Sequence, residues 1–261
     1  EENEIPCLFP TTDLPVVDRE EFFSVYLSKG IALEAEAIAQ RIREAGVASA
    51  RVLQVVAAGD ATSVAGADTL SRLLGDDITT LELTNVEENL GEFDAVVAWL
   101  GAAQLGSLYE QADDIPAEQV YLSGTLVEEG AGALSEALKP KVEVVYSTEL
   151  PGHTTRLLAR STGWFRFKRI YAPEHKAVQA NAYFAMKMLG GGLAAIHGYF
   201  SREYFIESIE HMVDNATYTS VYPRISLAPD QRFVSKGVRI AGFDESGKMT
   251  TLVDWLVPAT D

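Results

Sequence analysis

Short apolar runs alternate with segments of helical periodicity between residues 30 and 138. Ile31, Ala35, Ile38 and Ile42 recur at the spacing of one helix face. In chain order the pattern predicts strands at 51–57, 79–83, 95–100 and 119–122, and helices at 31–45, 64–74, 86–90 and 103–111. Strands that are apolar on both faces are typical of a parallel sheet between two layers of helices. The predicted fold class is therefore α/β, with a three-layer parallel sheet.

The rest of the chain has a different pattern. It predicts short strands at 5–9, 22–26 and 142–148, a basic and aromatic connector at 150–170, a long amphipathic helix, a second helix capped by Ser201, and an antiparallel strand pair at 233–243 and 249–257. The spacing of the long helix predicts a buried stripe of Val178, Ala182, Met186, Leu189 and Leu193. The run Gly190-Gly191-Gly192 is expected to weaken that helix locally.

The chain is acidic, with 38 Asp and Glu against 21 Lys and Arg and a formal net charge of −17. This balance repels phosphate groups, so neither nucleic-acid binding nor general binding to anionic membranes is expected. No window approaches about eighteen consecutive apolar residues, so no membrane span and no membrane insertion are expected. The first residues lack the basic and apolar regions of a secretory signal.

Cysteine and histidine usage limits the possible chemistry. The single cysteine, Cys7, excludes an internal disulfide and a thiolate metal site, and it is expected to be a small buried hydrophobe. The four histidines share no ligand spacing, and no nucleophile elbow is present. No cofactor, no metal and no catalytic residue are therefore predicted; the histidines are His153, His175, His197 and His211.

Three segments of the C-terminal third resemble a known family. They are Gln179-Ala-Asn-Ala-Tyr183-Phe-Ala-Met-Lys-Met-Leu189, Ser201-Arg-Glu-Tyr-Phe-Ile206-Glu-Ser-Ile-Glu-His211-Met, and Tyr222-Pro-Arg-Ile-Ser-Leu-Ala-Pro229-Asp-Gln-Arg-Phe233-Val-Ser-Lys-Gly237. In their order and in their residues they resemble the closing segment of periplasmic solute-binding proteins of the leucine/amino-acid type. The resemblance implies a type I fold of two lobes that close on a small polar solute and hand it to a membrane transporter.

The resemblance also implies a domain organisation. Residues 1–28 resemble the end of the first lobe and a crossover, 29–138 the second lobe, and 139–261 a connector, the returning first-lobe helices and the C-terminal strands. Most of the first lobe has no counterpart. The chain could be a fragment, a partner or preceding domain could supply the missing layer, or the protein could use a reduced form of the fold. In the last two cases the helices at 177–213 would need a protein partner to cover their apolar faces.

The candidate ligand contacts are loop residues that follow the predicted strands of the second lobe, together with one tyrosine near the crossover: Tyr26, Asp60, Thr62, Gly101, Gln104, Ser123 and Thr125. The resemblance implies an acidic residue near Thr125, and the nearest is Glu128. The alternatives are that Asp60 starts a helix, that Ser123 and Thr125 are ordinary loop hydroxyls, and that Tyr26 packs in the core.

The functional expectation is a non-enzymatic binding protein of an ABC-type uptake system for amino acids or other small solutes, located in the periplasm. The alternative is a structural or interaction subunit of a periplasmic complex that reuses the fold. The basic connector, with five Lys and Arg and no acidic residue between 156 and 169, could dock an acidic partner or could be a solvated segment.

Overall fold

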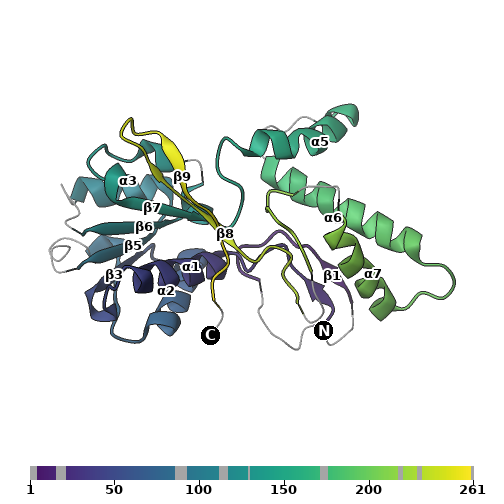
Figure 1. Ribbon diagram of the computed structural model, residues 1–261, viewed down its shortest axis with the longest axis horizontal. Helices are drawn as coiled ribbons and strands as arrows, with labels where there is room; N and C mark the ends of the chain where they lie inside the picture. Colours follow the sequence, from purple (N-terminus) through teal and green to yellow (C-terminus); the bar gives the residue numbers. More distant parts are fainter. Residues whose placement is uncertain are drawn as a thin grey trace. The chain divides into compact units, whose positions relative to one another are not determined.

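The computed structural model of the chain divides into two units (Figure 1). The sheet unit comprises residues 30–148 and 237–261, and the helical unit comprises residues 1–29 and 149–236. The structure describes residues 5–15, 22–85, 93–111, 117–128, 130–170, 176–216, 220–227 and 231–259. The helix predicted at 86–90 lies outside the described residues.

A seven-stranded sheet forms the centre of the sheet unit. Its strands are β3 (Val52–Val56), β4 (Thr79–Glu82), β5 (Ala95–Trp99), β6 (Gln119–Ser123), β7 (Val142–Tyr146), β8 (Val238–Phe243) and β9 (Met249–Leu256). They lie in the order β4-β3-β5-β6-β7-β8-β9. The first five are parallel, whereas β8 pairs antiparallel with β7 and β9 pairs antiparallel with β8. The predicted parallel sheet and the predicted strand pair are both confirmed, and the pair extends the same sheet.

Helices cover both faces of this sheet. They are α1 (Ile31–Glu44), α2 (Ala61–Leu74), α3 (Ala102–Gln111) and the short α4 (Gly124–Val127), with 3-10 turns at Ser49–Arg51, Leu83–Asn85, Gly130–Ala133 and Lys139–Lys141. Helices α1 and α2 lie on one side of the strands and α3 on the other (Figure 1). Every residue of β3 and β5 is buried, which explains why these strands, apart from Gln54, are apolar without alternation.

Tight packing joins α1 and α2 to the sheet. Ile31, Ile38 and Ile42 of α1 and Leu70 of α2 enter one buried cluster with Trp99 of β5. Gly66 allows α2 to approach closely, because a Cβ atom there would lie 2.6 Å from Cε3 of Trp99. The helical spacing of the isoleucines therefore predicted the correct buried face of α1.

The helical unit contains two very short strands and three helices. Strands β1 (Cys7–Leu8) and β2 (Ser24–Val25) pair in parallel, and the helices are α5 (Thr154–Phe167), α6 (Lys176–Ala195) and α7 (Arg202–Asp214). Ser201 caps α7, since its hydroxyl accepts a hydrogen bond from the Tyr204 amide at 3.1 Å. Phe9, Val25, Phe184, Ile209 and Val234 belong to a buried cluster that joins the β1–β2 pair to α6 and α7. Leu158 of α5 lies in a separate small cluster with Ala180 and Val221.

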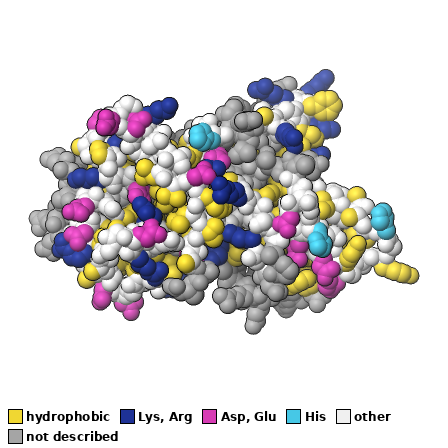
Figure 2. Space-filling model, in the orientation of Figure 1, with side chains coloured by type: hydrophobic (Ala, Val, Ile, Leu, Met, Phe, Trp, Pro, Cys, Tyr) yellow, Lys and Arg dark blue, Asp and Glu magenta, His cyan; other side chains and the backbone are white. Residues whose placement is uncertain are grey.

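Two expectations, for Cys7 and for the segment 150–170, are wrong. Cys7 is exposed rather than buried. The segment predicted as a connector contains α5, whose inner residues Leu158 and Ser161 are buried. Figure 2 shows Lys and Arg side chains gathered at the end of α5, where Phe167 is 80% exposed.

The buried stripe predicted for α6 is also wrong. Val178, Met186, Leu189 and Leu193 are between 43% and 51% exposed, and Ala182 is exposed as well. The buried face is instead made by Ala180, Asn181, Tyr183, Phe184, Met188 and Gly192. Both faces of α6 carry apolar residues at helical spacing, so periodicity alone could not choose between them.

The glycine run of α6 does not interrupt the helix. A Cβ atom at Gly191 would lie 2.2 Å from Cε of Met212, and one at Gly192 would lie 2.7 Å from Cδ1 of Ile209. Both partners belong to α7. The glycines therefore let α6 and α7 pack closely, and this contact offsets their low helix propensity.

Candidate functional site

Six of the seven candidate residues lie at one edge of the seven-stranded sheet. Strands β3, β5 and β6 are parallel neighbours in register, so their carboxyl ends meet at the same edge. Asp60 and Thr62 follow β3, Gly101 and Gln104 follow β5, and Ser123 and Thr125 lie at the end of β6. This edge is where open α/β sheets place their ligands.

Asp60 is the N-cap of α2. Its Oδ1 atom accepts hydrogen bonds from the amides of Thr62 at 2.9 Å and Ser63 at 3.3 Å. Ser63 is buried and links the end of β3 to the end of β5. Its hydroxyl accepts a hydrogen bond from the Ala57 amide at 2.9 Å and donates one to the Trp99 carbonyl at 2.7 Å. The capping alternative for Asp60 is thus confirmed, and the cap ties the ends of β3 and β5 together.

Gly101 and Gln104 form a local turn at the start of α3. The Gly101 amide donates to Oε1 of Gln104 at 2.9 Å, and the Gln104 amide donates back to the Gly101 carbonyl at 3.0 Å. Both residues are half-buried. The Gln104 side chain is therefore held at the sheet edge with its carbonyl oxygen engaged.

Ser123 and Thr125 bind a carboxylate that the sequence did not single out. Glu34 of α1 is fully buried, and its Oε2 accepts from the Ser123 hydroxyl at 2.5 Å and from the Thr125 amide at 3.2 Å. Its Oε1 accepts from the Thr125 hydroxyl at 2.7 Å and from the amide of Ser147, just after β7, at 3.0 Å. One side chain thus joins α1 to the ends of β6 and β7.

The electrostatics of Glu34 follow from this setting. Burial raises the pKa of the Glu34 carboxyl, and the hydrogen bonds from Ser123, Ser147 and Thr125 offset part of that rise. The signal in the sequence was an acidic residue at position 34, on the apolar face of α1 between Ile31 and Ile38. A glutamate in a buried stripe requires partners, and a search for them leads to the hydroxyls at 123 and 125.

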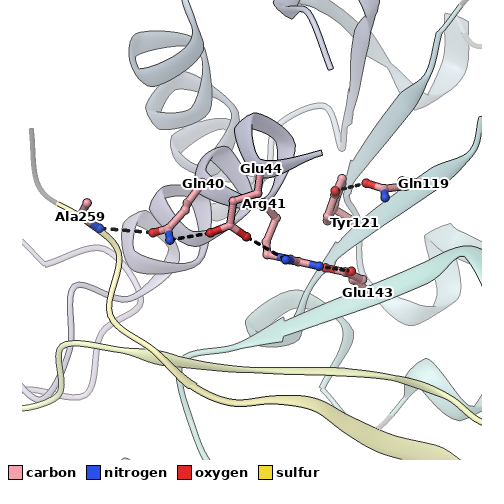
Figure 3. A network of polar contacts seen from close by, with 7 residues as sticks. All are labelled: Gln40, Arg41, Glu44, Gln119, Tyr121, Glu143 and Ala259. Carbon is pink, nitrogen blue, oxygen red and sulfur yellow. Dashed lines mark hydrogen bonds and ion pairs between the residues drawn. The ribbon is translucent and has the colours of Figure 1, made fainter. Parts of the chain in front are cut away.

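A second polar cluster lies about two turns along α1 from Glu34 (Figure 3). Arg41 donates to Glu143 of β7 through Nε at 3.0 Å and through Nη2 at 2.7 Å. Gln40 donates to Glu44 and accepts from the Ala259 amide at 3.3 Å. The cluster fixes the rotation of α1 relative to β7, and the same rotation directs Glu34 at the strand ends.

Tyr26 belongs to the helical unit and is nearly buried. Its ring stacks on Phe233 with centroids 5.6 Å apart. Its amide donates to the Arg232 carbonyl at 2.7 Å, and its carbonyl accepts from the Val234 amide at 3.1 Å. The backbone and ring of Tyr26 therefore hold the 232–234 segment in the core of this unit.

Glu128, the nearest acidic residue to Thr125, ends α4 with φ of 51° and is exposed. Among the described residues no group of three or more His, Cys, Asp or Glu is placed to hold a metal ion. In the same part of the chain no helix is both long and apolar enough to cross a membrane.

No protein-family model matches the sequence, and no curated protein matches it significantly. Solved structures do match the fold. A branched-chain amino acid ABC transporter protein from Thermus thermophilus with bound valine has a TM-score of 0.66 at 14% identity, with 99% of this chain and 74% of that chain covered. A leucine-binding protein from Thermotoga maritima has a TM-score of 0.65 at 15% identity, with 99% of this chain and 75% of that chain covered. An ABC transporter substrate-binding protein from Aeropyrum pernix has a TM-score of 0.65 at 12% identity, with 99% of this chain and 72% of that chain covered.

These likenesses define the class of fold. The chain has the fold of the type I periplasmic binding proteins, as its C-terminal third led us to expect. The resemblance stated from the sequence is therefore confirmed at the level of the fold.

Proposed function

We propose that this chain is a non-enzymatic solute-binding protein, the substrate-binding component of an ABC-type uptake system for amino acids or other small polar solutes. The observation that carries the proposal is the fold likeness over nearly the whole chain to substrate-binding proteins of such systems. We further propose that it works in the periplasm and delivers its solute to a membrane transporter. The sheet unit would correspond to the second lobe, and the helical unit would contain the incomplete first lobe.

The proposed solute contacts in the sheet unit are the loops at 59–62, 101–104 and 123–125. Thr62, Gln104 and Thr125 are half-buried at this edge, a degree of exposure that suits a side chain that contacts a small ligand. Ser123 is buried and holds Glu34, so its proposed part is to support the loop. Tyr26 remains a proposed contact from the helical unit.

Titration calorimetry of the protein against the twenty L-amino acids and a set of amides and other small polar metabolites tests the proposal. We expect at least one solute to bind and to raise the melting temperature. Gln104→Ala is expected to weaken binding, whereas Glu118→Ala is the matched control because Glu118 is exposed at the opposite end of β6. A wild-type protein that responds to no solute would contradict the proposal.

One observation favours a second candidate, an interaction subunit. The outer face of α6, made by Val178, Ala182, Met186, Leu189 and Leu193, presents large apolar side chains to solvent. A contiguous apolar face of this kind is typical of a protein interface. Under this candidate a protein partner covers the helices at 177–213, and native mass spectrometry of the protein from its source would show a complex. A free monomer would exclude it.

A further inference from the structure

The surroundings of Glu34 are those of a binding pocket for a carboxylate. Four donors converge on its two oxygens, and they come from Ser123, Thr125 and Ser147, at the ends of two neighbouring strands. Each oxygen accepts one hydroxyl and one backbone amide. Glu34 and Ser123 are fully buried, and Ser147 is 2% exposed. The donor set is therefore symmetric about the carboxylate, and the carboxylate itself is shielded from water.

The pocket suits the two acceptor oxygens of a carboxyl group, because three of its four donors are committed to donating. The amides of Thr125 and Ser147 can only donate. The Ser123 hydroxyl accepts from the Leu126 amide at 3.2 Å, which leaves its proton for the Glu34 carboxylate. An empty pocket would leave these buried donors without partners, which is costly in a protein interior.

The backbone around the pocket has little freedom to collapse. Gly124 lies between Ser123 and Thr125, and a Cβ atom there would come within 2.3 Å of Cδ1 of Tyr146 and 2.7 Å of the Val145 carbonyl oxygen. The turn after β6 is therefore packed directly on β7. The donors keep their positions relative to one another through this contact as well as through Glu34.

We propose that the ends of β6 and β7 form a carboxylate-binding site that the protein fills with its own Glu34. The site takes a small carboxylate, of the size of formate or acetate, when the Glu34 side chain is shortened to Cβ. Its occupant holds the 123–125 loop in place. This site shares Ser123 and Thr125 with the proposed solute loop at 123–125, but its occupant is the Glu34 side chain of α1.

Chemical rescue of Glu34→Ala by sodium formate tests the proposal. We expect the melting temperature of this variant to fall well below that of wild type and to rise by several degrees, saturably, as formate or acetate is added. Sodium chloride at the same ionic strength should not reproduce the rise. Glu44→Ala is the matched control, because Glu44 is an exposed glutamate on the same helix, and it should show no specific response to formate. A variant that folds only with formate would also support the site.

Glu34→Gln supplies a second measurement that needs no added ligand. Its amide group fills the pocket but directs N–H protons at donors, so the amides of Thr125 and Ser147 should exchange with deuterium faster than in wild type. If formate raises the melting temperature of Glu34→Ala no more than chloride does, the proposal is overturned. If Glu34→Ala folds under neither condition, unchanged amide protection at Thr125 and Ser147 in Glu34→Gln overturns it, and faster exchange supports it.

Discussion

Arg41 and Glu143 form a forked ion pair that joins α1 to β7, with N–O distances of 3.0 and 2.7 Å (Figure 3). The pair is partly buried, since the Arg41 and Glu143 side chains are 27% and 15% exposed. A fork of this kind needs the planar guanidinium, because a lysine ammonium can occupy only one of the two positions.

Arg41→Lys should therefore lower the free energy of unfolding by about 1–2 kcal/mol. Arg51→Lys is the control, since Arg51 makes a similar fork with Asp94 at a more exposed position, with side chains 48% and 44% exposed. That change should cost clearly less, because solvent screens the exposed pair. Urea denaturation measures both, and equal losses would show that burial of the Arg41 pair does not matter.

Gly66→Ala should destabilise the sheet unit by about 1–3 kcal/mol, although alanine is the better helix former. The new methyl group would collide with the Trp99 ring, which is fully buried and cannot move aside. Gly106→Ala in α3 is the matched control, because a Cβ atom there meets nothing within 4 Å. It should leave stability unchanged or raise it by about 0.5–1 kcal/mol. Thermal unfolding of the two variants would separate the cost of the steric clash with Trp99 from the gain in helix propensity.

Glu34 should make stability depend on pH. Because burial raises its pKa, the folded state holds the proton more tightly than the unfolded chain. The stability gained in this way is present below the ordinary value of about 4.3 and is lost as the pH rises through the raised value. Relative to Glu34→Gln, wild type should therefore lose unfolding free energy as the pH increases through this range.

Denaturation at a series of pH values would measure that change. Relative to Glu44→Gln, wild type should show a pH dependence of unfolding free energy with the opposite sign, because hydrogen bonds from Gln40 and Arg41 lower the pKa of Glu44. For Glu44 the contribution is present above the ordinary pKa and is lost as the pH falls. A difference between wild type and Glu34→Gln that does not vary with pH would contradict the prediction.

The two faces of α6 can be compared with one substitution at two positions. Met188 is 1% exposed and Met186 is 47% exposed. Met188→Ala should cost about 2–5 kcal/mol because it leaves a cavity in the core of the helical unit. Met186→Ala should change stability by no more than about 0.5 kcal/mol. A loss at Met186 that grows with protein concentration would show that another protein surface covers the outer face of α6 in solution.

Elements that depend on local sequence could be predicted. The strands of the parallel sheet followed from their apolar runs, and the caps at Asp60 and Ser201 followed from their residue types. The rest depends on contacts between distant residues. The inner face of α6 is selected by α7 and the small strands, and α5 is stabilised where Trp164 meets Tyr183 of α6. Neither contact leaves a local signal.

In the candidate site, too, the local features could be predicted and the contacts between distant residues could not. The sequence placed the loops at the carboxyl edge, because parallel strands make that edge common to them. It could not show that Ser123 and Thr125 are bound to Glu34, because those partners are 89 and 91 residues away. Only the packing of α1 against β6 and β7 brings them together.

The position of β8 between β7 and β9 has a consequence for biosynthesis. The sheet is interrupted after Thr148 and is resumed only at Gly237, once the whole of 149–236 has been made. During synthesis the edge of β7 that later pairs with β8 therefore has no partner strand until some ninety further residues have been made. In that interval this edge can pair with a wrong strand. Nascent chains released before residue 238 should be the ones that chaperones retain.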